Sequence, residues 1–397
     1  MSDKYFKARE EFEWKRNPQW PGIPQDDGNE NKIYLVYAVI EDNPNEIGLR
    51  TTGNNVDEYI DWGDGTVDGP IGPNFQIVYH TYDYTTVTGP ILQLEDGRNY
   101  KPVLIECKLA LGPYYLFYIW FNNTSSHSGS NNILEFVSYL GDGVTTSGPN
   151  ETRIVNSSYT RSVLMEHFKV KTPNNNYLDE MFWYCKSLKK IELPNNYFHS
   201  GISTLQNFGR AASFYGHDFG DIEVVEVLQM EYSDSFKIGN LTIDASETNV
   251  NSMCIHSNNY SIGNFTATGV TTAVYTFGGT VNNGCGSIGL IDTPALENAS
   301  YMFRRSQMPE VVFTDCSNIT TTTSMFYQCY AIQKLIMPGL IIGVDVNDSN
   351  LTADAIDDFF TSVGTASGAQ TLDVSDNPGS STCDTTIATA KGWTVIT

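Results

Sequence analysis

The second half of the chain repeats itself, and this self-similarity constrains the fold more than any other feature of the sequence. Segments 181–194 (MFWYCKSLKKIELP) and 325–338 (MFYQCYAIQKLIMP) agree at eight of fourteen positions, counting exchanges within the aliphatic or aromatic class. Four methionines mark unit starts at intervals of 23, 49 and 23 residues, namely Met230, Met253, Met302 and Met325. A degenerate copy near Thr276–Phe277 fills the long interval. Because one such unit cannot bury its apolar face alone, the period predicts a solenoid of stacked units.

Each unit is expected to place one short strand in a parallel ladder. The predicted strands are Ile191–Leu193, Val224–Val227, Leu241–Ile243, Phe265–Ala267, Ile288–Ile291, Val311–Phe313 and Leu335–Met337. Apolar residues near the unit starts are expected to stack inside the coil as the repeat core: Met181, Phe182, Cys185, Leu188, Met302, Phe303, Met325, Phe326, Cys329 and Ile332.

The period near 23 residues lies within the range of leucine-rich repeats, roughly 20–29 residues. The pattern Met-Phe-x-x-Cys-x-x-Leu-x-x-Leu-x-Leu-Pro, found at 181–194 and 325–338, resembles the BspA-like class of these repeats. Members of that class lie on microbial and viral surfaces, so the resemblance implies a surface protein that binds partners.

The first half becomes strand-like from Lys32 onward, beginning with the apolar run Ile33–Ile40. The Asp-Gly pair at 64–65 signals a hairpin turn, because glycine adopts positive φ at little steric cost. The segment DWGDGT, followed by HTY at 80–82, resembles a PKD-type immunoglobulin-like β-sandwich. The resemblance implies structural roles for the residues of the turn and the closing strand: Asp61, Trp62, Gly63, Asp64, Gly65, Thr66, His80 and Tyr82.

The two ends of the chain are predicted to flank these modules. Residues 1–30 are mixed in charge and carry Trp14 and Trp20, which suggests an anchoring arm, since tryptophan is a frequent interface anchor. A flexible tail is the alternative, and deletion of 1–30 is expected to leave the fold intact. At the other end, Thr352 is the expected N-cap of an amphipathic helix in a small cap.

The predicted fold is therefore mainly β. It comprises an N-terminal Ig/PKD-like β-sandwich, a parallel β-solenoid of leucine-rich-type repeats and a small α/β C-terminal cap. The predicted boundaries are 1–30 for the extended arm, 31–145 for the sandwich, 146–345 for the solenoid and 346–397 for the cap.

Composition narrows the function classes. The net charge of −23 repels phosphate backbones, which argues against nucleic acid as a partner. No apolar run approaches the roughly 20 residues of a membrane helix, so no membrane insertion is expected. The amino end lacks the apolar core of a secretory signal. Seven widely spaced cysteines without a Cys-x-x-Cys pair argue against a disulfide framework and a zinc site.

Candidate chemistry is sparse. Asp61 with Asp64 is better explained by the turn than by paired catalytic carboxylates, and His80 with Asp83 is a weak base–orienter pair. No phosphate-binding loop, zinc-protease motif or nucleophile elbow occurs. The sequence therefore predicts a non-enzyme with no catalytic residues, no metal and no cofactor.

The whole layout resembles structural proteins of tailed bacteriophages, including marine phages and cyanophages. That resemblance implies a virion location on the particle exterior, as a tail, fibre or capsid-decoration protein in particle assembly and host attachment. The implied partners are other virion proteins, a host-surface glycan or protein, and further copies of the chain. Two alternatives remain open: a bacterial cell-surface adhesin with leucine-rich repeats, and a virion-associated glycan depolymerase.

Overall fold

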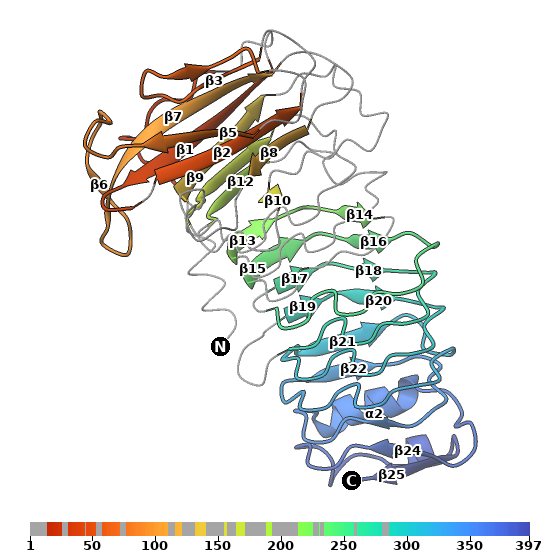
Figure 1. Cartoon of the computed structure of the whole chain (residues 1–397). Helices are drawn as coiled ribbons and strands as arrows, with labels where there is room; N and C mark the ends of the chain where they lie inside the picture. Colours follow the sequence, from red (N-terminus) through yellow and green to blue (C-terminus); the bar gives the residue numbers. More distant parts are fainter. Residues whose placement is uncertain are drawn as a thin grey trace. The chain divides into compact units, whose positions relative to one another are not determined.

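The computed structural model describes residues 14–25, 31–43, 45–52, 58–71, 77–109, 116–120, 132–139, 155–156, 164–170, 188–192, 213–224, 230, 234–257, 260–279 and 286–397. The chain is mainly β, with 35% strand and 6% helix, as predicted (Figure 1). It divides into two compact units. The first, here the sheet unit, holds Lys7–Phe198 and Leu205–Tyr215, and the second, the solenoid unit, is centred on Gly216–Thr397.

The described residues of the sheet unit form two sheets. The larger has the order β12-β11-β9-β1-β7-β3-β4, with β6 also paired to β7. Its strands are β1 (Asn31–Ile40), β3 (Tyr59–Asp61), β4 (Val67–Asp68), β6 (Leu92–Gln93), β7 (Asn99–Leu109), β9 (Ile133–Tyr139), β11 (His167–Val170) and β12 (Lys190–Glu192). The smaller has the order β10-β8-β2-β5, made of β2 (Asn45–Thr52), β5 (Ile77–Tyr82), β8 (Leu116–Trp120) and β10 (Val155–Asn156).

Strand β1 is buried on both faces, which explains its unbroken apolar run. On the inner face, Tyr37 stacks on Tyr82 of the smaller sheet with ring centroids 5.3 Å apart. On the outer face, Val36, Ala38 and Ile40 belong to a buried cluster that includes Trp20. The segment at 14–25 thus forms a third layer over the larger sheet.

One edge of the larger sheet continues as a parallel ladder. Phe136 of β9 pairs in register with Phe168 of β11, which pairs in turn with Ile191 of β12. The rings of Phe136 and Phe168 stack with centroids 5.1 Å apart. The predicted strand Ile191–Leu193 therefore pairs within the sheet unit, because β11 offers it a parallel edge there. It does not pair with the strands of the solenoid unit described below.

The solenoid unit confirms the predicted β-solenoid and has about seven turns. One ladder has the order β14-β16-β18-β20-β21-β22, formed by β14 (Ile222–Val224), β16 (Leu241–Ile243), β18 (Phe265–Thr266), β20 (Leu290–Asp292), β21 (Glu310–Phe313) and β22 (Lys334–Ile336). A second ladder has the order β13-β15-β17-β19, formed by β13 (Ser213–Asp218), β15 (Asp234–Ile238), β17 (Tyr260–Ile262) and β19 (Gly286–Ile288). In the first ladder, β16, β18, β21 and β22 overlap predicted strands, and β14 ends at Val224, where the predicted strand Val224–Val227 begins; the rest of that predicted strand lies outside the described residues. The second ladder was not predicted.

A glycine corner separates the two ladders. A Cβ on Gly263 would lie 2.3 Å from the carbonyl oxygen of Gly239, and one on Gly289 would lie 2.3 Å from that of Gly263. The turns approach too closely here for any side chain. For this reason the predicted single strand Ile288–Ile291 is wrong: Gly289 divides it into the end of β19 and the start of β20.

The repeat core forms as a stack of rings. Phe277, Phe303 and Phe326 lie one above another, with successive centroids 5.6 and 5.5 Å apart. The degenerate copy at Thr276–Phe277 is therefore in register with the others. Of the predicted repeat core, seven residues are at most 1% exposed: Leu188 in the sheet unit, and Met302, Phe303, Met325, Phe326, Cys329 and Ile332 in the solenoid unit. Met181, Phe182 and Cys185 lie outside the described residues.

Helices and a short sheet close the carboxyl end. Strands β23 (Val344–Asp345), β24 (Gln370–Asp373) and β25 (Trp393–Ile396) pair in parallel, accompanied by α2 (Ala353–Ser362) and α3 (Thr386–Thr389). Thr352 is the N-cap of α2, as predicted, and its side chain accepts a hydrogen bond from the Ala355 amide. The Lys391 ammonium donates to the carbonyls of Phe360, Thr361 and Val363 at the other end of α2. In the described part of the chain, no helix has the length and hydropathy of a membrane span.

Candidate functional site

One face of the solenoid unit is built from segments without Asp or Glu, with the Glu247 carboxylate hydrogen-bonded to the Asn249 amide at its edge. It consists of four turn segments, 249–257, 271–279, 298–308 and 321–333, and is called the turn face below. Parallel bridges join Asn249 to Thr272, Thr272 to Asn298 and Asn298 to Thr321, which hold the four segments in register. The segments contain no Asp or Glu, although the chain carries 46 acidic residues. The segments themselves carry two positive charges, Arg304 and Arg305, while Glu247 and Glu297 flank them.

A pair of tyrosines forms the centre of the turn face. Tyr275 and Tyr301 lie on successive turns and stack with centroids 4.7 Å and planes 7° apart. Both residues have positive φ, 56° and 58°, as do Ser252 and Ser324 at the equivalent positions of the neighbouring turns. A bulky residue in this region is strained by about 1–3 kcal/mol. Because all four turns share the conformation, the backbone geometry of the turn fixes where these rings stand.

An arginine joins the tyrosines into one surface. The Arg304 guanidinium lies 6.0, 5.6 and 5.5 Å from the ring centroids of Tyr275, Tyr301 and Tyr327. Its Nη1 also donates to the Tyr275 hydroxyl over 3.3 Å. These distances are typical of cation–π contacts. The side chain is therefore held over the aromatic rings with its charge available at their margin.

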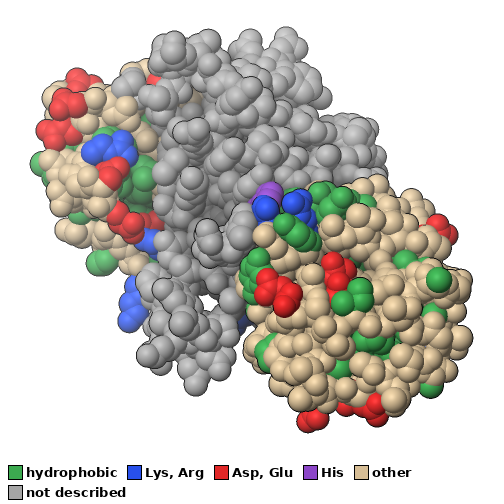
Figure 2. All heavy atoms as spheres, turned by 90° about the horizontal axis from the view of Figure 1, so that it is seen from below, with side chains coloured by type: hydrophobic (Ala, Val, Ile, Leu, Met, Phe, Trp, Pro, Cys, Tyr) green, Lys and Arg blue, Asp and Glu red, His purple; other side chains and the backbone are tan. Residues whose placement is uncertain are grey.

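Neither arginine of the turn face is neutralised by a carboxylate in the described part of the chain. Arg305 donates from Nε to Gln328 Oε1 over 3.0 Å, and Arg304 bonds to a tyrosine hydroxyl. By contrast, Lys334, outside the face, forms a long ion pair with Glu310 at 3.7 Å. Tyr327 and Tyr330 are 47% and 40% exposed. In Figure 2, basic side chains lie directly beside hydrophobic ones at the margin of the solenoid unit.

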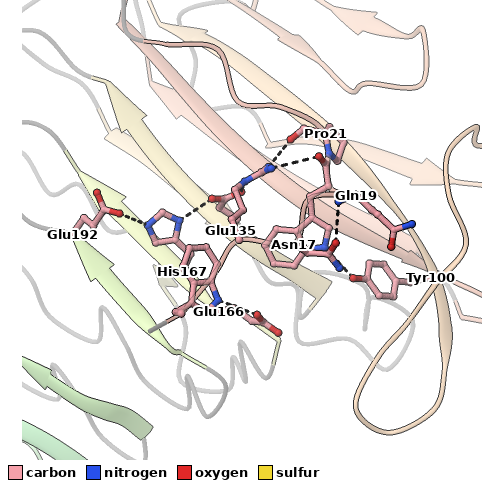
Figure 3. A network of polar contacts seen from close by, with 11 residues as sticks. Asn17, Gln19, Pro21, Tyr100, Glu135, Glu166, His167 and Glu192 are labelled. Atoms are coloured by element: carbon pink, nitrogen blue, oxygen red, sulfur yellow. Dashed lines mark hydrogen bonds and ion pairs between the residues drawn. The ribbon is translucent and has the colours of Figure 1, made fainter. Parts of the chain in front are cut away.

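The sheet unit holds a second polar cluster, drawn in Figure 3. His167 lies between two carboxylates, with Nδ1 at 2.7 Å from Glu135 Oε1 and Nε2 at 3.2 Å from Glu192 Oε1. Arg16 reaches Glu135 Oε2 from Nε over 2.8 Å, and the Trp14 ring lies 4.6 Å from the His167 ring. Every charged group in this chain of contacts has a partner. The cluster therefore fastens segment 14–25 to strands β9 and β11, which is a structural role.

Glu192 at the end of this cluster is strongly acidic. Partial burial alone would raise the pKa of this carboxyl group. Hydrogen bonds from Lys190 and Lys169 and the charge of His167 outweigh that effect and lower the pKa from 4.5 to about 2. Since the folded state lowers this pKa, the carboxylate stabilises the fold above pH 4.5, and that contribution is lost as the pH falls toward 2.

Glu192→Gln is therefore expected to lower the melting temperature near neutral pH. The free-energy cost should be about 1 kcal/mol or less, since solvent screens this partly exposed group. In thermal melts from pH 7 down to pH 2, the melting temperatures of the variant and the parent should converge between pH 4.5 and 2. A difference in melting temperature that stays constant over that pH range would contradict the lowered pKa of Glu192.

The tryptophans expected to anchor an arm elsewhere lie on this chain's own larger sheet. Trp20 is 5% exposed, and its Nε1 donates to the Tyr100 hydroxyl over 3.0 Å. Trp14 Nε1 donates to Glu166 Oε2 over 3.2 Å. The structure thus argues against the expectation that 1–30 is dispensable for folding. Tryptophan is a frequent anchor both at interfaces and in cores, and the sequence could not distinguish the two.

Trp20→Phe is expected to destabilise the sheet unit by about 1–2 kcal/mol, because the variant loses the indole hydrogen bond and some buried volume. The measurement is urea unfolding followed by circular dichroism. Tyr79→Phe, at a side chain that is 43% exposed, is the matched control and should unfold with the parent. If the two variants unfold at the same urea concentration, residues 14–25 do not contribute to the core.

The predicted turn residues converge in one cluster. Trp62 is fully buried and stacks on His80 with centroids 4.8 Å apart, while the Tyr82 hydroxyl donates to the Trp62 carbonyl. His80 Nε2 lies 2.8 Å from Asp64 Oδ2. The alternative pairing of His80 with Asp83 is wrong, since Asp83 accepts hydrogen bonds from Thr85 instead.

The carboxylates of this turn accept hydrogen bonds from its backbone amides. Asp61 Oδ1 accepts from the Gly63 amide and Asp64 Oδ1 from the Thr66 amide. Burial acts against ionisation, but hydrogen bonds from Thr66 and His80 hold the pKa of Asp64 below its usual range. Sequence reasoning missed one member of the cluster, Asp68, whose Oδ2 accepts from Trp62 Nε1 over 2.8 Å. No sequence signal marked it, because the cross-strand pairing that brings it close depends on the register.

Metal-binding and thiol chemistry find little support in the residues described. They contain no group of three or more His, Cys, Asp or Glu side chains that could hold a metal ion. Burial raises the pKa of the Cys329 thiol to about 12, so this sulfur stays protonated at neutral pH.

Comparison with known proteins gives no match to a family model, a curated protein or a solved structure.

Proposed function

We propose that this chain is a non-enzymatic structural and adhesive protein on the exterior of a tailed-phage particle, in the tail, in a fibre or on the capsid. The observation that carries the adhesive part is the turn face, where stacked tyrosines and two arginines stand on a solenoid of about seven turns. Such a surface is preorganised, because its side chains are fixed by packing before any partner arrives. The particle location is supported by the sequence resemblance to tailed-phage structural proteins.

Two finer assignments belong to the same proposal. The sheet unit is a PKD-like module, supported by the contacts of Trp62, His80 and Tyr82 around the Asp-Gly turn. The solenoid is of leucine-rich type, supported by its period near 23 residues and by the pattern Leu372-x-Val374-x-x-Asn377 in the cap that follows it. Asn377 is buried, accepts from the Leu351 amide and donates to the Val346 and Val374 carbonyls. In this account the partners are other virion proteins, further copies of this chain and a host-surface molecule.

Quantitative mass spectrometry of purified particles from the source tests this function. Hundreds of copies per particle would indicate a capsid or tail-wall protein, and a few to a few dozen would indicate a fibre, collar or baseplate protein. Absence from particles, together with recovery from bacterial cell envelopes, would overturn the proposal in favour of a bacterial adhesin. Release of saccharides from host envelopes by the purified chain would overturn its non-enzymatic part.

A further inference from the structure

The turn face has the chemistry of a glycan site. Sugars present an apolar ring face that stacks on aromatic side chains, and acidic sugars add a carboxylate that pairs with arginine. Tyr275 and Tyr301 stack on each other and help to hold the Arg304 guanidinium, while Tyr327, 47% exposed, offers an open ring beside it. Here we infer that the turn face binds a polysaccharide that carries carboxylate groups at intervals along its chain. This inference rests on the proposed adhesive function and names its ligand class.

Charge complementarity favours an acidic sugar over a neutral one. Arg304 and Arg305 are neighbours in a strip without Asp or Glu, and neither pairs with a described carboxylate. The Nε of Arg304 is buried and has no hydrogen-bond partner among the described residues. Two uncompensated guanidinium groups match a ligand that brings its own carboxylate, since arginine and carboxylate pair in a two-pronged geometry.

The net charge of −23 argues against a densely charged ligand. Duplex DNA carries one charge for about every 1.7 Å of its axis, so most of its phosphates would meet an acidic surface. A polysaccharide with widely spaced carboxylates can place one carboxylate at the arginines while its neutral sugars stack on the exposed rings of Tyr327 and Tyr330. Stacking along the solenoid axis also suits a chain ligand, because the turns repeat at roughly the 4.7–4.9 Å spacing of paired strands.

Binding of hyaluronate fragments, in which every second sugar carries a carboxylate, tests this inference by titration calorimetry on the full chain. Arg304→Gln is expected to weaken binding about tenfold or more, because a charged hydrogen bond is lost. Tyr327→Ala is expected to weaken it several-fold without a folding defect, because this side chain is 47% exposed. Lys334→Gln, a basic residue outside the turn face, is the matched control and should bind as the parent does.

Two further ligands distinguish carboxylate-dependent glycan binding from other kinds of binding. Dextran, a neutral polysaccharide, should bind at least tenfold more weakly than hyaluronate, and single-stranded DNA should not compete. The requirement for carboxylate would be overturned if dextran bound as tightly as hyaluronate and Arg304→Gln did not weaken that binding. Tighter binding of DNA, or no binding of any probe by a chain whose melting curve is normal, would overturn the glycan site. Detection of the chain on particles would leave the proposed function standing in each of those cases.

Discussion

Phe303→Ala is expected to lower the free energy of unfolding of the solenoid unit by about 3–5 kcal/mol. The Phe303 ring is fully buried between Phe277 and Phe326 and meets Phe313 edge-on at 6.1 Å. Removing it leaves a cavity in the middle of the stack that the neighbouring rings cannot fill without shifting. In a solenoid each turn is stabilised mainly by its neighbours, so a gap weakens the turns on both sides.

Guanidinium unfolding followed by circular dichroism measures this loss. Tyr327→Ala removes an aromatic ring of similar size one turn away, but from a side chain that is 47% exposed. That control should change stability by no more than about 0.5 kcal/mol. A Phe303→Ala variant that unfolds within 1 kcal/mol of the control, on the order of ordinary surface changes, would mean that the aromatic stack is not the core.

Gly63→Ala should destabilise the sheet unit by about 3 kcal/mol or more, from strain and overpacking together. Gly63 has a φ of 77°, and a Cβ there would lie 2.1 Å from the Leu104 carbonyl oxygen. That oxygen belongs to β7, which is paired on both sides and cannot move away. The turn would have to separate from the sheet, which would also disturb the Trp62 stack.

Gly65→Ala, two residues away, is the matched control. Gly65 also has positive φ, 95°, but no heavy atom lies within 4 Å of its Cβ position. The expected loss of stability is therefore only the cost of holding alanine at positive φ, about 1 kcal/mol. The sequence singled out Gly65 through its Asp-Gly signal, yet the structure makes Gly63 the more sensitive position. Thermal melts in which both variants lose equal stability would show that contact with β7 does not constrain the turn.

The solenoid could be predicted because its signal is local and repeated. Strand β16 falls at the predicted Leu241–Ile243, and the degenerate unit at Thr276–Phe277 is in register. The second ladder could not be predicted in the same way. Its strands β15, β17 and β19 lie just before the glycine corner, and their short apolar stretches merge with those that follow. Only the close approach of Gly263 to Gly239 shows that the chain bends there.

Contacts between residues distant in sequence account for most of what was missed. The ion pair of Arg16 with Glu135 spans more than a hundred residues, and His167 pairs with both Glu135 and Glu192 across strands. No periodicity links such positions. The turn face was missed for another reason. Tyr275, Tyr301 and Arg304 read as irregular insertions between core positions, and they form one surface only because the turns stack.

We propose that the chain stands on the outside of a particle, where its turn face meets a partner. Immunogold electron microscopy of intact particles, with an antibody raised against the full chain, tests this most directly. We expect gold on undisturbed particles, and loss of the label when the antibody is first absorbed with the purified chain. Gold that appears only after particles are broken open, or only on bacterial envelopes, would contradict it.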